Sequence, residues 1–217
     1  MRQLGTGDVV YLLFAARWTV VLSAAAFAGG GVVGLIVALA RVSAVRPARW
    51  AAVAFIRVFQ GTPVLLQLFL VFFGGDLLGV PLGAYGSAIL GLSLNAGAFL
   101  GEIWRGAIEA VPPGQVEAAR ALGLRYSARM VRVVLPQALR IAVAPTVGFL
   151  VNLVKSTSLA AVIGFVELTQ AGKLLNNSTF RPFTVFGIVA GIYFLLCWPL
   201  TLASRALEAR LGRAYER

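Results

Sequence analysis

Long uncharged stretches alternate along the chain with short segments that carry most of its charge. Four stretches are long enough to cross a bilayer as a helix, because about 20 apolar residues span the hydrocarbon core. They run from 18 to 40, 58 to 75, 77 to 101 and 182 to 204. Helices are expected because lipid offers the peptide backbone no hydrogen-bond partner.

A fifth stretch, residues 141–154, is uncharged but shorter, reaching only ~21 Å as a helix. It is long enough to cross if the flanking side chains of Arg140 and Lys155 extend towards opposite surfaces. Residues 156–166 are expected to form a loop with a short helix that dips back into the protein. Pro63 and Pro145 either break their helices beside a cavity or produce packing kinks.

The pattern predicts an all-α, polytopic transmembrane bundle of about five helices, forming a single domain over residues 1–217. The first helix is expected to be retained, because its apolar run exceeds the ~7–15 residues of a signal-peptide core. The expected crossings are 18–40, 56–75, 82–101, 140–155 and 182–204, with a loop at 102–139.

The distribution of basic residues predicts how the bundle is oriented across the membrane. The chain has 19 basic and 8 acidic residues, and 13 of the basic ones follow the first, third and fifth crossings. The positive-inside rule places those segments in the cytoplasm, with the N-terminus outside and the C-terminus inside. Because the arginines gather at the ends of apolar runs, the net charge of +11 does not indicate nucleic-acid binding.

Composition supports a membrane protein and disfavours an enzyme. Only 12% of residues are charged, about half the share of a soluble domain. The chain has no histidine and a single cysteine, Cys197, so an intrachain disulfide is impossible and the commonest general base is absent. No metal site is expected. Three G-x-x-x-G pairs, at Gly30, Gly97 and Gly187, are expected to pack helices inside the bundle.

The segment between the third and fourth crossings has the features of two short helices joined by a sharp turn. Pro113 suits the first turn of a helix, and Ala118 and Ala119 combine strong helix propensity with little bulk. Gly123 can end that helix in the left-handed conformation, and Ser127 can cap the next one.

Two interpretations of this segment stay open on physical grounds. Its slim alanine face suits docking into a groove of another protein. Alternatively, it is an amphipathic segment that only seats the bundle at the membrane surface.

The spacing of residues in this segment resembles the EAA loop of ABC-importer permeases, Glu-Ala-Ala-x3-Gly-x9-Ile-x-Leu-Pro. Val133 stands where that pattern has isoleucine. The six matching positions, which the resemblance implies couple the permease to an ATPase, are Glu117, Ala118, Ala119, Gly123, Leu135 and Pro136.

Three other segments resemble the branch of this family that carries polar amino acids. They are residues 59–68, 99–106 and 155–159, and the whole resemblance covers roughly residues 15–210. Gln60 replaces the usual arginine of the first segment, and Ser156 the usual aspartate of the third. The sequence does not name the amino acid.

The resemblance implies a permease subunit of an ATP-driven importer for polar amino acids or close derivatives, in the bacterial cytoplasmic (inner) membrane. Its loop would dock on a cytoplasmic ABC ATPase dimer. A second permease, identical or homologous, would complete the pathway, and an external solute-binding protein would deliver substrate. No cofactor is expected in this chain: it lacks G-x-x-x-x-G-K-[ST], so ATP and Mg would bind the ATPase.

Polar residues inside apolar spans are candidates for the translocation pathway. Gln67 and Asn95 lie inside the second and third crossings, and Asn152, Lys155 and Ser158 cluster at the end of the fourth. Lys155 could attract the carboxylate that every amino acid carries. Each of these side chains could equally form an interhelical hydrogen bond.

The alternative function is an ATP-independent secondary transporter or channel. Inverted repeats are common in that class, and the sequence shows none. An intramembrane enzyme is also disfavoured, because the chain has neither an H-E-x-x-H nor a G-x-S-x-G motif.

Overall fold

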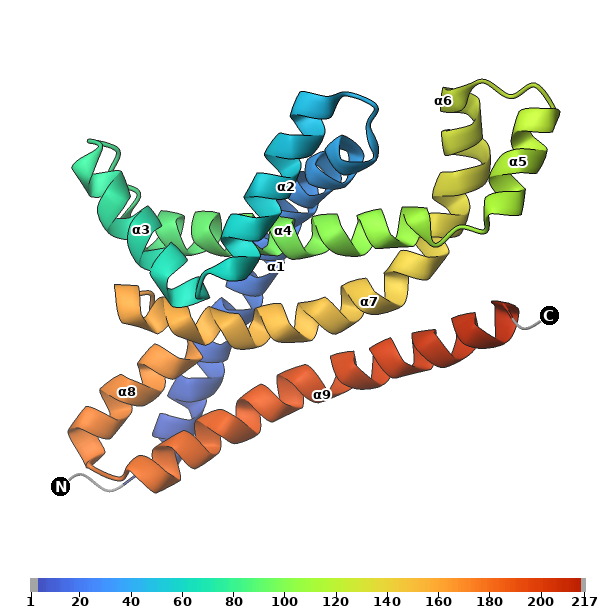
Figure 1. Cartoon of the computed structure of the whole chain (residues 1–217). Helices are drawn as coiled ribbons and strands as arrows, with labels where there is room; N and C mark the ends of the chain where they lie inside the picture. Colours follow the sequence, from blue (N-terminus) through green and yellow to red (C-terminus); the bar gives the residue numbers. More distant parts are fainter. Residues whose placement is uncertain (1–3, 216–217) are drawn as a thin grey trace.

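The computed structural model describes the backbone of residues 4–215 and the side chains of residues 4–210, and all regular structure in that part is helical (Figure 1). The prediction of an all-α membrane bundle is confirmed: four helices are long and apolar enough to cross a membrane, or five if one bent pair counts as a crossing. The elements are α1 (Thr6–Val42), α2 (Arg46–Gly61), α3 (Val64–Leu77), α4 (Gly83–Glu109), α5 (Pro113–Ala121), α6 (Tyr126–Arg129), the π-helical η1 (Met130–Val134), α7 (Leu135–Ser156), the 3₁₀-helical η2 (Thr157–Ile163), α8 (Leu168–Thr179) and α9 (Pro182–Tyr215).

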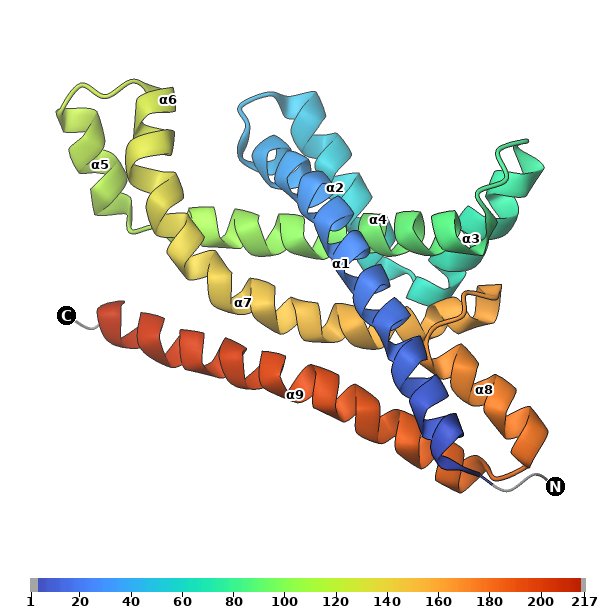
Figure 2. The same ribbon diagram turned by 180° about the vertical axis from the view of Figure 1, so that it is seen from behind.

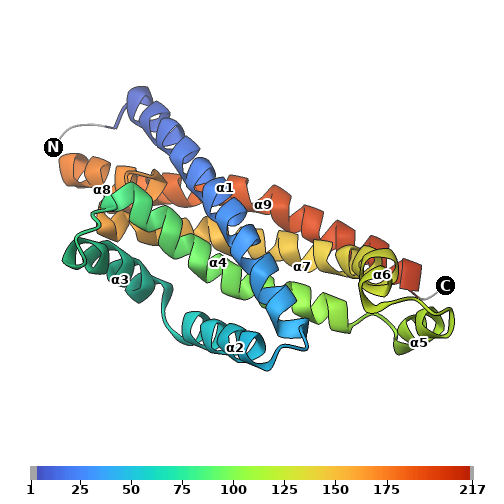
Figure 3. The ribbon, with the colours of Figure 1, turned by 90° about the horizontal axis from the view of Figure 1, so that it is seen from above.

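The long helices run between two distinct ends of the molecule. Helices α4, α7 and α9 extend in similar directions, and α1 crosses them obliquely (Figures 1 and 2). The view from above places α8 and the start of α1 at one end, and α5, α6 and the end of α9 at the other (Figure 3). The start of α1 and the end of α9 thus lie at opposite ends of the described structure.

Helix α1 packs closely against α4 where two G-x-x-x-G pairs meet. A Cβ on Gly30 would lie 2.5 Å from the Ala96 Cβ, and one on Gly97 would lie 2.4 Å from Val33 Cγ1. These contacts leave no room for a side chain, so the first two pairs do pack the bundle internally, as predicted. Among the described residues nothing comes within 4 Å of a Cβ built on Gly187, so the third pair is not part of this packing.

The predicted second crossing is not one straight helix. Helices α2 and α3 meet at 107° around Thr62 and Pro63. Proline has no N–H and disfavours a helical residue before it, and Thr62 is accordingly extended, with ψ of 145°. The sequence identified the breaking residue, and the structure shows that the break turns the chain sharply.

Helix α7 ends within the depth of the bundle. Val154, near its end, packs with Cys197 of α9, which lies fifteen residues after the start of α9 at Pro182, about 22 Å along that helix. Lys155, the next residue, therefore lies near the middle of α9 and not near its start. The helical turn η2, a left-handed Gly164 with φ of 85° and helix α8 continue from this point towards α9.

Candidate functional site

Helix α5 ends in a tight turn at Gly123. The Gly123 N–H donates to the Arg120 carbonyl (2.9 Å), and the Leu124 N–H donates to the Ala119 carbonyl (3.1 Å). These two bonds form a Schellman turn, which requires a left-handed residue, and Gly123 has φ of +73°. A Cβ on Gly123 would meet nothing within 4 Å in the described structure, so its requirement for glycine comes from backbone conformation alone.

The two faces of α5 differ. Glu117, Ala118 and Ala121 are exposed, whereas Ala119 is 3% exposed and Val116 packs near Ala107 and Val134. The exposed face therefore carries small side chains, as the sequence predicted. Ala119 is not part of that face, because it is buried on the opposite side of α5, against the rest of the protein.

The return helix begins earlier than predicted. Arg125 is the extended residue before α6, and its side chain makes no capping bond. The prediction that Ser127 caps this helix is wrong, because the Schellman turn already sets the chain direction. After α6 the π-helical η1 leads to Leu135, which is half-buried, and to the exposed Pro136 in the first turn of α7. The ribbon bends at this junction (Figure 1), where proline cannot donate a backbone hydrogen bond.

Ion pairs form at the C-terminal end of α4, where the loop that contains α5 begins. Arg105 binds both Glu102 and Glu109, its neighbours one helical turn to either side. Arg41 at the end of α1 approaches Glu102, with Nε and Oε2 3.8 Å apart.

Gln67 and Asn95 are brought together by the break between α2 and α3. The Asn95 Nδ2 donates to Gln67 Oε1 (3.0 Å), and Gln67 Nε2 donates to the carbonyls of Phe59 (2.7 Å) and Thr62 (3.0 Å). Both side chains are 5% exposed. The two amides thus satisfy carbonyls that the helix break leaves without intrahelical partners.

Asn152, Lys155 and Ser158 form a separate group, and no hydrogen bond joins it to Gln67 or Asn95 in the described part of the chain. Asn152 and Lys155 are exposed, and Ser158 is half-buried and donates to the Lys155 carbonyl (2.7 Å). An exposed lysine within the depth of a membrane bundle is costly against hydrocarbon. Its position therefore requires a polar cavity or another protein beside it.

The two residues that change a charge of the family pattern make hydrogen bonds to nearby carbonyls. Gln60 Nε2 donates to the Ala98 carbonyl (3.3 Å), which ties α2 to α4. Ser156 Oγ donates to the Asn152 carbonyl within the same helix (2.9 Å). Neither introduces a charge near the pathway candidates.

Sequence reasoning missed a buried carboxylate at the start of α8. Glu167 is 0% exposed and accepts hydrogen bonds from Tyr193 (2.6 Å), Thr19 (3.2 Å) and the Gln170 backbone N–H (3.0 Å). It therefore joins α1, α8 and α9 at one point. A signal existed: Glu167 is the only acidic residue between Glu117 and Glu208, and an acidic residue within a membrane segment is a functional candidate by default.

The described helices fit a known transport family. A family model of the binding-protein-dependent transport system inner membrane component matches residues 30–213. The chain belongs to this family. The predicted identity as a permease subunit, a transport protein rather than an enzyme, is confirmed, and the chain is a multi-pass membrane protein.

Relatives of this permease are named as amino-acid transport proteins. It is 36% identical over 200 residues to the probable amino-acid ABC transporter permease protein YckA of Bacillus subtilis (strain 168), covering 92% of this chain and 88% of the relative. It is 37% identical over 193 residues to the histidine/lysine/arginine/ornithine transport system permease protein HisM of Salmonella typhimurium, covering 83% and 81%.

Two solved structures share the fold of the permease. A chain from the crystal structure of an amino acid ABC transporter with histidines superposes with a TM-score of 0.89 at 30% identity, covering 96% of this chain and 100% of that one. A chain of the inward-facing MetNI methionine ABC transporter superposes with a TM-score of 0.78 at 22% identity, covering 95% and 99%. The second likeness concerns the fold alone.

Proposed function

We propose that this permease imports polar amino acids across the bacterial cytoplasmic membrane, driven by a separate ATPase. The observation that carries the proposal is the exposed, small-residue face of α5, ended by the left-handed Gly123. The amino-acid substrate is inferred from the relatives, whose names specify amino-acid transport.

The proposed partners are supported by the shape of the loop and by the family. A cytoplasmic ATPase dimer would bind ATP and Mg and receive α5 in a groove, with one permease subunit on each ATPase. A second permease, identical or homologous, would line the other side of the pathway, and an external binding protein would deliver the amino acid. Within this assembly, residues 1–217 form a single permease domain, with five crossings and its N-terminus outside.

Lys155 is proposed to contact substrate. It is exposed within the depth of the bundle, beside the exposed Asn152, and a cation there is favourable only near polar groups or a counter-charge. The carboxylate of an amino acid supplies that counter-charge. Gln67 and Asn95 are proposed to shape the pathway by fixing the bend between α2 and α3, and Ser158 to line it near Lys155.

The docking proposal is tested at Gly123. Gly123→Val should reduce uptake and substrate-stimulated ATP hydrolysis together, because a β-branched residue resists the left-handed conformation. Gly123→Asn is the matched control, since asparagine tolerates that conformation and the site has room for a side chain. Both variants should reach the membrane normally. If Gly123→Val transports like Gly123→Asn at equal abundance, the turn does not couple transport to ATP hydrolysis.

The outer face of α5 is tested independently by Ala118→Asp. A carboxylate there must lose its water when α5 docks, so the ATPase should co-purify less well. Ala118→Ser adds a single oxygen atom and no charge, and should behave like the wild type. Equal co-purification of ATPase with both variants would show that Ala118 does not contact it.

Orientation is tested with single cysteines after Cys197→Ala. Gly114 on α5 and Asn177 on α8 are exposed and should label from opposite sides with a membrane-impermeant thiol reagent. Gly172 is unsuitable as the outer position, because a Cβ there would lie 2.8 Å from Val189 Cγ2. Labelling of both positions from one side would contradict the five-crossing topology.

A further inference from the structure

The ends of α1, α2 and α4 line, with α5 and α6, an open surface cavity of about 630 Å³. Four guanidinium groups line it, from four different elements, and one carboxylate is present, that of Glu109. The arginines are Arg41, Arg49, Arg120 and Arg129. The translocation pathway proposed above does not involve any of these residues.

The positive charge of this basic cavity is only partly neutralised. Glu109 is bound by Arg105, and Arg41 is 3.8 Å from Glu102. Considering residues 4–210, no carboxylate forms an ion pair with Arg49, Arg120 or Arg129. Three guanidinium groups around one space favour an anion with several oxygen acceptors, such as a phosphate.

Contacts with the chain itself hold two of these arginines in place. Arg49 donates through Nη2 to the Ser43 carbonyl (2.7 Å), and the Arg129 guanidinium lies over the Tyr126 ring, 5.5 Å from its centroid. Each guanidinium keeps further N–H donors for a ligand. The cavity is therefore organised before any ligand arrives, which reduces the entropic cost of binding.

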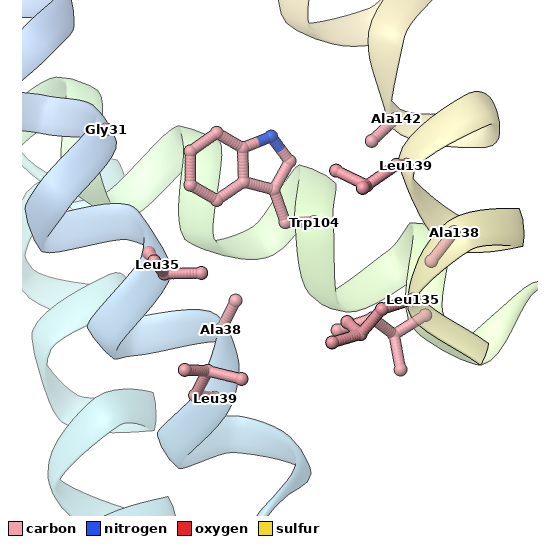
Figure 4. Close-up of a pocket in the computed structure, with 10 residues that line it drawn as sticks. Gly31, Leu35, Ala38, Leu39, Trp104, Leu135, Ala138, Leu139 and Ala142 are labelled. Atoms are coloured by element: carbon pink, nitrogen blue, oxygen red, sulfur yellow. The ribbon is translucent and has the colours of Figure 1, made fainter. Parts of the chain in front are cut away.

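The basic cavity continues into an apolar groove. Arg49, Tyr126 and Met130 line both the cavity and an adjoining space of about 730 Å³, which shares Leu39 and Leu135 with a third space of about 290 Å³. This last space lies between α1 and α7, with Trp104 of α4 between them (Figure 4). Its lining is almost wholly apolar and includes Leu35, Ala38, Leu139 and Ala142.

Aromatic side chains mark the level of the basic cavity as a membrane interface. Trp50 beside Arg49 is 69% exposed, and Tyr126 at the rim is 57% exposed. Tryptophan and tyrosine gather at the headgroup level of membranes. These two side chains support a position for the cavity at the level of lipid headgroups, and the apolar groove extends from it along α1 and α7.

We propose that the basic cavity and apolar groove bind an anionic phospholipid of the cytoplasmic leaflet. The headgroup phosphate lies among Arg49, Arg120 and Arg129, and an acyl chain follows the groove between α1 and α7. Basic pockets between transmembrane helices on the cytoplasmic side recognise anionic headgroups in this way. The proposal depends on the orientation given under Proposed function, which places α5 in the cytoplasm.

The positions of residues around helix α5 favour a lipid over an acidic segment of the ATPase as the ligand of the basic cavity. Arg120 lines the cavity, whereas Ala118, two residues earlier and about 200° away around the helix, lies on the exposed face. The ATPase-facing surface and the basic cavity are thus on different sides of α5. A bound lipid would connect the α1–α2 turn to the back of the coupling helix.

The test uses the intact importer, purified with its ATPase and reconstituted in lipid nanodiscs. The probe is phosphatidylglycerol with a photoactivatable acyl chain, and phosphatidylcholine with the same chain is the comparison. The cavity variant is Arg49→Gln with Arg129→Gln. The matched control is Arg46→Gln with Arg125→Gln, which removes two exposed arginines outside the cavity lining, one from α2 and one directly before α6.

Labelling of groove residues by phosphatidylglycerol should be roughly 30-fold weaker in the cavity variant, from the loss of two basic contacts. The control variant should be labelled by phosphatidylglycerol as strongly as the wild type. Phosphatidylcholine should label the wild type and the two variants equally weakly. Wild-type labelling should also decline between about 0.1 M and about 1 M salt, because the Debye length falls from ~10 Å to ~3 Å. This salt series decides the question even if the cavity variant fails to accumulate.

Three results with the lipid probe would overturn the proposal. They are equal labelling of the cavity and control variants, salt-independent labelling of the wild type, and full displacement of the probe by inorganic phosphate, which has no acyl chain. Crosslinking from Leu39→Cys to a protein partner in place of lipid would overturn it as well. ATPase co-purification is measured in the same samples. If the ATPase does not co-purify, the proposed function fails. If the ATPase co-purifies but both lipids label the groove equally, only the lipid site fails.

Discussion

The bundle contains two groups of polar side chains whose surroundings are opposite. Gln67 and Asn95 are buried and hydrogen-bonded to each other and to the carbonyls at the α2–α3 break. Asn152 and Lys155 on α7 are exposed, although they lie within the depth of the bundle. In the sequence the two groups look alike, as polar residues in apolar stretches.

The difference separates two reasons for placing polar residues in a membrane. The first group satisfies backbone groups that proline and a sharp bend leave without partners, a requirement imposed by lipid. In the second group, the side chains of Asn152 and Lys155 make no hydrogen bond within the described part of the chain, so they are free to bind a ligand. We therefore expect changes in the first group to affect folding, and changes in the second to affect transport.

The largest effect is expected for Asn95→Leu. The substitution removes the donor to Gln67 Oε1 and leaves that oxygen buried without this partner. An unsatisfied buried polar group costs roughly 1–3 kcal/mol, so we expect about 2 kcal/mol lower stability and several-fold lower membrane abundance. The measurements are abundance by immunoblot and the thermal midpoint of the solubilised complex.

Asn152→Leu is the matched control, because it makes the same change at an exposed position. Its abundance should stay near that of the wild type. If Asn152→Leu lowers abundance as much as Asn95→Leu, the distinction between the two groups fails. Transport per molecule of the surviving Asn95→Leu protein should remain largely normal.

The next effect concerns Lys155→Ala. Loss of a charged hydrogen bond to substrate is worth ~1.5 kcal/mol, so the concentration for half-maximal uptake should rise about tenfold at unchanged abundance. Lys173→Ala, which removes the other lysine of the chain, is the control and should leave uptake unchanged. Parallel losses of abundance and uptake in Lys155→Ala would instead identify Lys155 as a structural anchor.

Much of the fold could be predicted because lipid restricts the choices. The long membrane helices were recognisable from the uncharged runs. The turn at Gly123 was recognisable because glycine readily adopts the left-handed conformation. The depth of α7 could not be predicted, because it depends on the packing of Val154 against Cys197 in α9. The 107° angle at Pro63 likewise depends on contacts from α3 and α4.

The candidate site was predicted less completely for a related reason. A motif identifies the residues of a loop but not which face of its helix is free, and Ala119 is buried beside the exposed Ala118. The cavity around Arg49 and Arg129 combines residues 80 positions apart, and the partners of Glu167 come from three helices. Such groupings arise from tertiary contacts that no local spacing encodes.

The smallest effect is expected for Tyr193→Phe, which extends the comparison to the third polar group. The substitution removes the hydroxyl that donates to Glu167 Oε2 (2.6 Å), but Thr19 and the Gln170 N–H still bind that carboxylate. Interhelical hydrogen bonds in membranes average ~0.6 kcal/mol, so the thermal midpoint should fall only slightly and uptake should not change. Tyr85→Phe is the control, since the Tyr85 ring is half exposed and packs on Trp18 and Phe165. A severe loss of uptake in Tyr193→Phe at normal abundance would show that the Glu167 group acts in transport, and would place it with Lys155 instead of with Asn95.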